Sequence, residues 1–404
     1  MSALRTIRIS DTTENVSEIL SLMARDSEII ETLFLERDID ERLMNQLSTM
    51  LQSNTTLRNL SFYCHTVQCS TEPLLKSLSM NKTLKRIRFT EVGCPDICRI
   101  LQYSNIEEFI VTNCFGGYFT PQIMLNNTTL KTLYIGDYVN VELGFTEFVE
   151  GIVNNPHCAL QKFITYDELY EEHLPDLIKL INHTKLVKLH LYNIRFQDEG
   201  MISALQTIEV NNTIKDLFIR LDTDTDTDRD TNGGWTDTDS SNVVMKAFAR
   251  VLACNKVLEN INLRNSNIAD YFDIFISGLR CNTTLRKLNL EYCGLNNRQC
   301  MDIYNYLKNQ TSMIELCMRL GLGQIPCFDD QIFNRIDMLI ERNKRRPKMV
   351  KYLRYLDLED QEGQEDRPVG IVFTKQETDM FIGFILVSGL SYELNRLIAS
   401  YILE

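Results

Sequence analysis

The sequence predicts an α/β solenoid in which short parallel strands alternate with helices and each repeat stacks on the next. Two observations lead to this prediction. Apolar residues recur at positions i, i+3 and i+5 of a block that returns at intervals of about 27 residues. The phrase before the block also recurs, reading Asn-Thr-Thr-Leu at 54–57, 127–130 and 282–285. Self-similarity at a fixed period indicates a repeat architecture, because one repeat cannot bury its own apolar side and neighbours must stack.

Twelve blocks make up the series. They begin at Leu4, Ile30, Leu57, Leu84, Ile106, Leu130, Leu160, Leu186, Ile214, Leu258, Leu285 and Met313. The apolar residues of a block point inward from a short strand and its entry turn, and the residues between them point outward. One block departs from the pattern, because Thr165 occupies the third apolar position. The fourth and fifth units span 22 and 24 residues, so we expect only a short helix or an irregular turn in 90–105 and in 112–129.

Helical segments are predicted between the blocks. Ile39, Leu43 and Leu47 recur at helical spacing and therefore lie on one helix face. The same pattern is found at 173–181, 243–252, 270–279 and 298–307. An Asn precedes several blocks where the helix ends. We expect this Asn to tolerate left-handed backbone and to form local side-chain hydrogen bonds.

With these residues the chain resembles the leucine-rich repeat family, in its ribonuclease-inhibitor-like subclass of long repeats. The clearest match is Leu285–Leu295, which reads L-x-x-L-x-L-x-x-C-x-L with Cys293 at the turn position. The match at Leu258–Ile268 has Ser266 there. The resemblance covers roughly residues 1–345. It implies a horseshoe with a parallel concave sheet and convex helices, and it says little about function.

Three parts are expected along the chain. Residues 1–345 form the solenoid, and Asp329–Asn343 is its last amphipathic helix. Residues 346–368 form a basic and then acidic linker, and residues 369–404 form a small helical C-terminal appendix that acts as a cap or as a docking element. The linker prediction rests on the bases in Arg342–Arg354 and the acids in Asp357–Asp366.

Acidic residues gather in two segments. The net charge is −13, of which Asp222–Asp239 and Asp357–Asp366 contribute −6 each. The first segment explains the 44-residue step from Ile214 to Leu258, and we expect a loop inserted at 222–240. Its alternating Asp residues are similar to a calcium loop only loosely, because the Gly and Glu that an EF-hand requires are missing. The near-neutral remainder has no broad basic face of the kind that nucleic-acid binding requires.

Composition indicates a reduced compartment. Twelve Cys without an export signal favour free thiols in the cytoplasm, and the bases of Arg342–Arg354 leave a nuclear location open. Cys254 and Cys281 are one repeat apart, so we expect them to be small buried residues of successive repeats. The longest apolar run, Met380–Leu390, is too short to span a bilayer, so no membrane association is expected.

The outward positions of the strands predict a binding surface. Apolar or aromatic residues occupy position i+4 in five consecutive repeats, with Tyr and Arg neighbours at i+6 and Lys162, Lys188 and Asp216 at i+2. Such composition is typical of an interface core. The residues predicted to contact a protein partner are Ile110, Tyr134, Ile164, Tyr166, His190, Tyr192, Phe218 and Arg220. The alternative is that strand curvature makes these side chains pack on one another without any ligand.

The sequence contains no nucleophile elbow, phosphate loop or zinc motif, so we expect no catalytic residue, cofactor or metal. The predicted function is that of a monomeric, non-enzymatic protein-interaction scaffold. Two alternatives remain. Leu390–Leu403 weakly resembles the first helix of F-box-like ubiquitin-ligase adaptors, although Ser391 stands where they usually have Pro. The acidic stretch Asp357–Asp366 is similar to the tail of leucine-rich repeat GTPase activators.

The repeat phrase is also similar to that of the tropomodulin actin-capping proteins. The ladder begins at Leu4, so we expect no N-terminal actin-binding extension of their kind.

Overall fold

A computed structural model describes residues 5–26, 29–64, 67, 69–93, 97–114, 120–136, 144–183, 185–221, 238–318 and 330–359. The chain divides into two compact units, Met1–Ile303 with Glu315–Phe328, and Tyr304–Ile314 with Asp329–Glu404. The Asp-Thr loop at 222–237, most of the acidic stretch at 357–366 and the C-terminal segment 369–404 lie outside the described residues. The predictions made for calcium, for an F-box-like helix and for an acidic tail therefore stay predictions.

The first unit contains a single parallel sheet of 12 strands, arranged in chain order. The strands are β1 (Arg5–Ser10), β2 (Ile30–Glu36), β3 (Asn59–Tyr63), β4 (Arg86–Thr90), β5 (Glu108–Thr112), β6 (Thr132–Ile135), β7 (Lys162–Tyr170), β8 (Lys188–Arg195), β9 (Asp216–Ile219), β10 (Asn260–Asn262), β11 (Lys287–Asn289) and β12 (Glu315–Cys317). Each strand begins within a predicted block. The chain is therefore a leucine-rich repeat solenoid of the α/β class.

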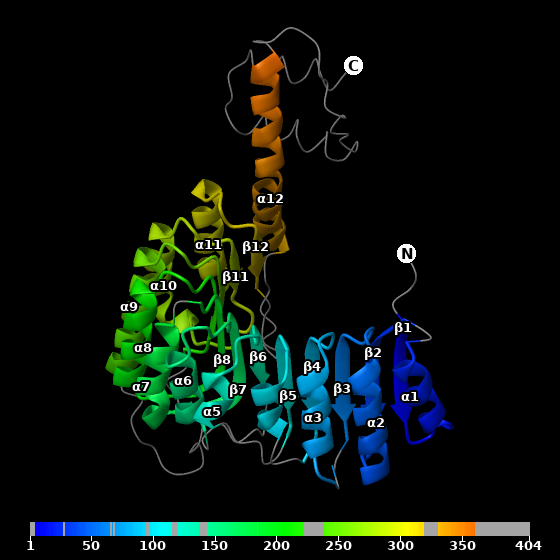
Figure 1. The fold of residues 1–404 in the computed structure, drawn as a ribbon. Helices are drawn as coiled ribbons and strands as arrows, with labels where there is room; N and C mark the ends of the chain where they lie inside the picture. Colours follow the sequence, from blue (N-terminus) through cyan, green and yellow to red (C-terminus); the bar gives the residue numbers. More distant parts are fainter. Residues whose placement is uncertain are drawn as a thin grey trace. The chain divides into compact units, whose positions relative to one another are not determined.

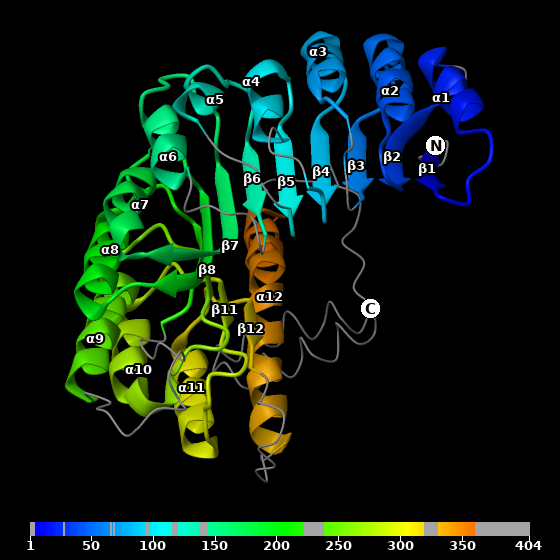
Figure 2. The ribbon, with the colours of Figure 1, turned by 90° about the horizontal axis from the view of Figure 1, so that it is seen from below.

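Helices follow the strands and cover one face of the sheet (Figures 1 and 2). They are α1 (Val16–Ala24), α2 (Glu41–Ser53), α3 (Glu72–Met80), α4 (Ile100–Tyr103), α5 (Pro121–Leu125), α6 (Phe145–Val153), α7 (Leu174–Ile181), α8 (Asp198–Val210), α9 (Thr238–Cys254) and α10 (Phe272–Cys281). The next helix, α11 (Asn297–Asn309), begins in the first unit and ends in the second. We call the opposite face, away from α1–α10, the outward face. The short α4 and α5 confirm the expectation for the two short units.

The core lies between the sheet and the helices. The consensus residues Leu57, Leu60 and Phe62 are buried, and Phe62 stacks on Phe89 of the next repeat with ring centroids 4.7 Å apart. Thr165 takes the inward position despite its hydroxyl, because its Oγ1 accepts a hydrogen bond from the backbone N–H of Asp167 at 3.1 Å. Stacked repeats thus form one continuous core.

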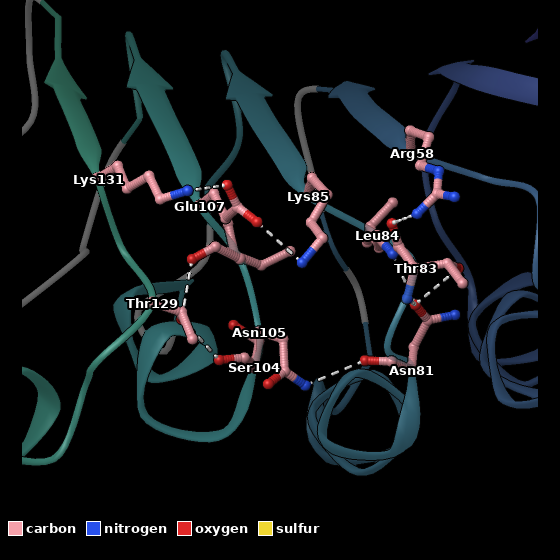
Figure 3. Close-up of polar contacts among 11 residues, drawn as sticks. Arg58, Asn81, Thr83, Leu84, Lys85, Ser104, Asn105, Glu107, Thr129 and Lys131 are labelled. Carbon is pink, nitrogen blue, oxygen red and sulfur yellow. Dashed lines mark hydrogen bonds and ion pairs between the residues drawn. The ribbon is translucent and has the colours of Figure 1, made fainter. Parts of the chain in front are cut away.

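Asn side chains, all but one of them buried, join several repeats to the repeat before. The Asn81 amide donates to the backbone oxygen of Leu51 at 2.7 Å and to that of Asn54 at 3.2 Å. Its Oδ1 accepts from the backbone N–H groups of Thr83 and Leu84, at 2.9 and 2.8 Å (Figure 3). Comparable donations to the preceding repeat are made by Asn54, Asn127, Asn155, Asn211, Asn255 and Asn282. We call this series the Asn ladder.

The local side-chain hydrogen bonds expected for these Asn residues are confirmed, but their backbone is not left-handed. Asn54, Asn81 and Asn282 have φ of −72°, −73° and −82° and are extended. An extended Asn at the helix end lets its side chain reach two peptide groups of its own turn while its amide crosses to the preceding repeat. Among the described non-glycine residues, positive φ occurs instead at Asn15, Asp26, Glu91, Asn113, Asn265 and Tyr292.

The cysteines correct another expectation. Cys254 and Cys281 are exposed rather than buried, because each is the last residue of its helix and precedes a buried ladder Asn. Cys293 is buried, and its Sγ donates to the backbone oxygen of Leu263 at 3.1 Å. No disulfide joins any two of the ten described cysteines.

The second unit contains the helix α12 (Asp330–Glu359). Ile332, Ile336 and Ile340 of the predicted amphipathic stripe are buried. The Arg342 guanidinium donates to the backbone oxygen of Leu307 at 3.0 Å, and Asn343 donates to that of Met313 at 2.8 Å. Because α12 continues to Glu359, the first 14 residues of the predicted linker, 346–359, are helical. Within the described residues no helix is long and apolar enough to cross a membrane.

Candidate functional site

The strand register brings the predicted outward residues into one row. Ile110 pairs with Tyr134, Tyr134 with Ile164, Ile164 with His190, and His190 with Phe218. Parallel strands lie about 4.8 Å apart, so neighbours in such a row are in side-chain contact range. The five residues therefore form a continuous row on β5–β9, as the block spacing predicts.

An aromatic cluster forms around this row. The rings of Tyr166 and Tyr192 stack with centroids 3.7 Å apart, and Tyr192 stacks on Phe218 at 3.9 Å. Tyr134 lies against Tyr166 at 5.6 Å, and His190 lies against Phe218 at 5.9 Å. These spacings fall in or below the usual range for paired aromatic rings. We call these five residues the aromatic cluster.

Exposure divides the predicted site residues into two groups. Ile110 and Phe218 are only 6% and 4% exposed, so they pack beneath the surface and offer little area to a partner. His190 is also buried. The accessible part consists of Tyr134, Ile164, Tyr166 and Tyr192, which are half-buried, and Arg220, which is exposed. The mutual packing considered as an alternative is therefore present, and it leaves half-exposed edges of three tyrosines at the surface.

A charged group lies beside the cluster. Asp216 accepts from His190 Nε2 at 2.8 Å on one oxygen and from Lys188 Nζ at 3.0 Å on the other. Burial opposes ionisation of this carboxyl, but the hydrogen bonds and charges of His190 and Lys188 outweigh burial and hold its pKa below the ordinary value. Asp216 is therefore ionised at neutral pH, and it fixes the orientation of the His190 ring within the aromatic cluster.

The Tyr192 hydroxyl stays neutral. Burial raises the pKa of Tyr192 far above its ordinary value, and the neighbouring Tyr166 and the charge of Asp216 act in the same direction. A neutral, half-buried phenol offers an apolar ring and a polar tip together. This combination is why Tyr is enriched at protein interfaces.

The sequence interpretation missed an extension of the sheet. Strands β7 and β8 pair a second time beyond a register shift, with Glu168 opposite Asn193 and Tyr170 opposite Arg195. Glu168 accepts from Arg195 Nη2 at 2.8 Å and from the Tyr170 hydroxyl, and these hydrogen bonds lower the pKa of Glu168. The sequence carries no clear signal for this longer strand, because two of the inward positions after Phe163 are the polar residues Thr165 and Asp167.

Within the described residues no three His, Cys, Asp or Glu side chains are placed to hold a metal ion. The described partners of His190 are the Asp216 carboxylate, which is hydrogen-bonded to its Nε2, and the rings of Tyr192 and Phe218. The geometry is that of a contact surface made of rings on rigid strands.

Comparison with known proteins gives matches among solved structures. No family model and no curated protein matches the chain. One similar solved structure is Leiomodin-1 Actin-Binding Site 2, which is 20% identical, covers 46% of this chain and 96% of its own, and has a TM-score of 0.32. Another is the tropomodulin C-terminal domain from Caenorhabditis elegans, 12% identical, with 44% and 98% covered and a TM-score of 0.33. Likenesses at these scores carry no argument about function.

Proposed function

We propose that the chain is a non-enzymatic protein-interaction module that binds a protein partner with the outward face of β6–β9. The observation that carries the proposal is the stack of Tyr166, Tyr192 and Phe218, held on rigid strands with its tyrosine edges half-exposed. Rigid aromatic anchors lose little conformational entropy on binding, which makes them typical interface hot spots. We further propose that it acts in the cytoplasm as a monomer, and that its repeats are of the ribonuclease-inhibitor-like type.

The surroundings of the stack support contact with a protein. Arg220, the residue after β9, is exposed. The ion pair of Lys188 with Asp216 lies beside the aromatic cluster. An apolar centre with charged residues around it is the usual anatomy of a protein interface. The cluster also sits on strands, and sites built on regular elements hold their geometry better than sites on loops.

The experiment compares proteins that co-purify with tagged variants, by quantitative mass spectrometry. Tyr166→Ala with Tyr192→Ala should reduce recovery of a specific partner at least about tenfold, since aromatic hot spots contribute roughly 2 kcal/mol or more. Tyr63→Ala is the matched control, because Tyr63 is an exposed tyrosine at the equivalent position of β3. Thermal unfolding must show that the double variant is folded.

Two results would contradict the proposal. One is unchanged recovery of every partner by a folded Tyr166→Ala, Tyr192→Ala protein. The other is an equal loss in the Tyr63→Ala control. Tyr192→Phe keeps the stack and removes only the hydroxyl, so it separates the contribution of the ring from that of the polar tip.

A further inference from the structure

Basic residues gather where the strands β3–β7 begin. We define the strand-entry edge as the residue before each strand together with the first residue of that strand. On β3–β7 this edge carries five bases, and Arg88 lies two residues further along β4. We call the whole set the basic patch; its members are Arg58, Lys85, Arg86, Arg88, Lys131 and Lys162.

Two carboxylates neutralise part of the patch. Glu107 lies between Lys85 and Lys131, with N···O distances of 2.9 and 2.7 Å (Figure 3). Hydrogen bonds from Lys131 and Lys85 lower the pKa of Glu107, so it is ionised at neutral pH. Glu108 pairs with Arg86 at 2.6 Å. Six bases thus face two carboxylates, which leaves this edge positive on a chain whose net charge is −13.

Three bases of the patch have no carboxylate partner among the described residues, and Lys85 and Lys131 share one. Arg58 donates to the backbone oxygen of Thr83 at 3.1 Å and has no carboxylate partner among the described residues. Arg88 and Lys162 are exposed and form no ion pair with any residue that the structure describes. Exposed like charges repel one another, so an anion that binds near these three bases would relieve their repulsion.

We infer that the basic patch binds an acidic segment of a partner protein. This inference deepens the proposed function and rests on it, since it names the chemistry of one part of the partner. From β3 to β7 the patch crosses four strand intervals, about 19 Å, which an extended polypeptide of about six residues spans. Lys162 begins the strand that carries Ile164 and Tyr166. The acidic segment therefore continues toward the aromatic cluster.

A short acidic polypeptide fits this surface better than a nucleic acid does. Nucleic acids need a basic face that follows many phosphates. The patch ends at β7, because the next bases along the edge are neutralised. Lys188 is paired with Asp216 at 3.0 Å and Lys215 with Glu259 at 2.9 Å. A short run of Asp or Glu residues matches the length of the basic patch, which extends from β3 to β7.

The test is binding of a labelled oligoglutamate peptide to the full chain, measured by fluorescence anisotropy at low salt. Arg88→Glu with Lys162→Glu should weaken binding at least about tenfold. Arg286→Glu is the matched control, because Arg286 is an exposed base on the same edge at β11, and it should change affinity by less than about twofold. Glu107→Gln should strengthen binding, because it releases two lysines.

Three results would overturn the inference. The first is no binding by the wild-type chain. The second is an equal loss in the Arg286→Glu control, and the third is an oligothymidylate of equal length that competes as well as the peptide does. Tyr166→Ala with Tyr192→Ala should leave peptide binding intact. A failure of the basic patch and a failure of the aromatic cluster are therefore distinguishable.

Discussion

The strand-entry edges of β3–β7 and β8–β12 have the same backbone and different electrostatics. On β8–β12 each carboxylate of the edge is matched by a base on the neighbouring strand. These pairs are Lys188 with Asp216, Lys215 with Glu259, and Lys287 with Glu315. On β3–β7 five bases of the edge face Glu107 and Glu108 alone. The repeat thus fixes where side chains stand, and the residues between the consensus positions decide what each region can bind.

What the two regions share is the Asn ladder. Asn81 in the first region and Asn255 in the second both donate to the backbone oxygen of the preceding ladder Asn, at 3.2 and 2.9 Å. The inward consensus residues are buried in both, except Leu316 and Met318 of the last block, which are half-buried. The two regions therefore have the same core and the same hydrogen bonds between repeats, and they differ on the outward face.

The largest expected effect concerns this shared scaffold. Asn81→Ala and Asn255→Ala should each lower the free energy of unfolding by about 2–4 kcal/mol, because buried backbone oxygens and N–H groups lose their partner. Asn154, an exposed Asn at the end of α6, is the control, and its change to Ala should cost less than about 0.5 kcal/mol. Urea unfolding measures both. Similar losses for Asn81→Ala and Asn154→Ala would show that the ladder does not stabilise the repeats.

A smaller effect separates the two regions. Asp216→Asn should cost about 1–2 kcal/mol at neutral pH, because its partners His190 and Lys188 are only 11% and 26% exposed. Glu108→Gln should cost less than about 1 kcal/mol, because its partner Arg86 is 49% exposed and water screens the pair. Equal costs for the two changes would remove this difference between the regions.

The Asp216 contribution should also depend on pH. Its folded pKa is depressed, so the stabilisation is complete above the unfolded value of about 4 and is lost as the pH falls through the folded pKa. The difference in unfolding free energy between wild type and Asp216→Asn should therefore shrink when the pH is lowered below about 4. A difference that stayed constant or grew on acidification would contradict the assignment.

The smallest effect concerns two tyrosines at equivalent positions. The pKa of Tyr63 on β3 is raised first by its hydrogen bond to Glu91, at 3.1 Å, whereas that of Tyr192 on β8 is raised first by burial. Glu91→Gln should lower the Tyr63 pKa toward its ordinary value of about 10 and leave Tyr192 unchanged. NMR titration of ring-labelled tyrosine measures both. A Tyr63 pKa that did not respond would show that the hydrogen bond is not its cause.

The sequence predicts the periodic part of this molecule well. The blocks place β1–β12 and the inward residues, because a period of about 27 residues leaves few ways to bury the apolar side. The row from Ile110 to Phe218 follows from the same spacing. Periodicity carries no information about details that depend on tertiary contacts. It could not show that Ile110 and Phe218 are nearly buried, or that β7 and β8 pair beyond Tyr166.

The remaining differences have local causes. The expected left-handed backbone at the ladder Asn residues is not found, because their hydrogen bonds need an extended Asn. The residue type at the end of a helix does not reveal this requirement. Cys254 and Cys281 were expected to be buried because they are one repeat apart. That spacing shows only that they occupy the same position in successive repeats, and this position is exposed. The net charge of whole segments also does not reveal the charge pattern on the outward face. Neighbouring bases such as Lys85 and Lys131 are 46 residues apart in the chain, and they come together only in the sheet.

The most direct measurement of the central claim is site-specific photo-crosslinking in cells. A benzoylphenylalanine at position 164, the half-exposed Ile164 in the middle of the outward row, should give a crosslink to a protein partner. The same residue at position 153, where the exposed Val153 ends α6 on the helical side, should give none. Crosslinking at 153 and not at 164, or at neither position, would contradict the claim that the outward face of β6–β9 is the binding surface.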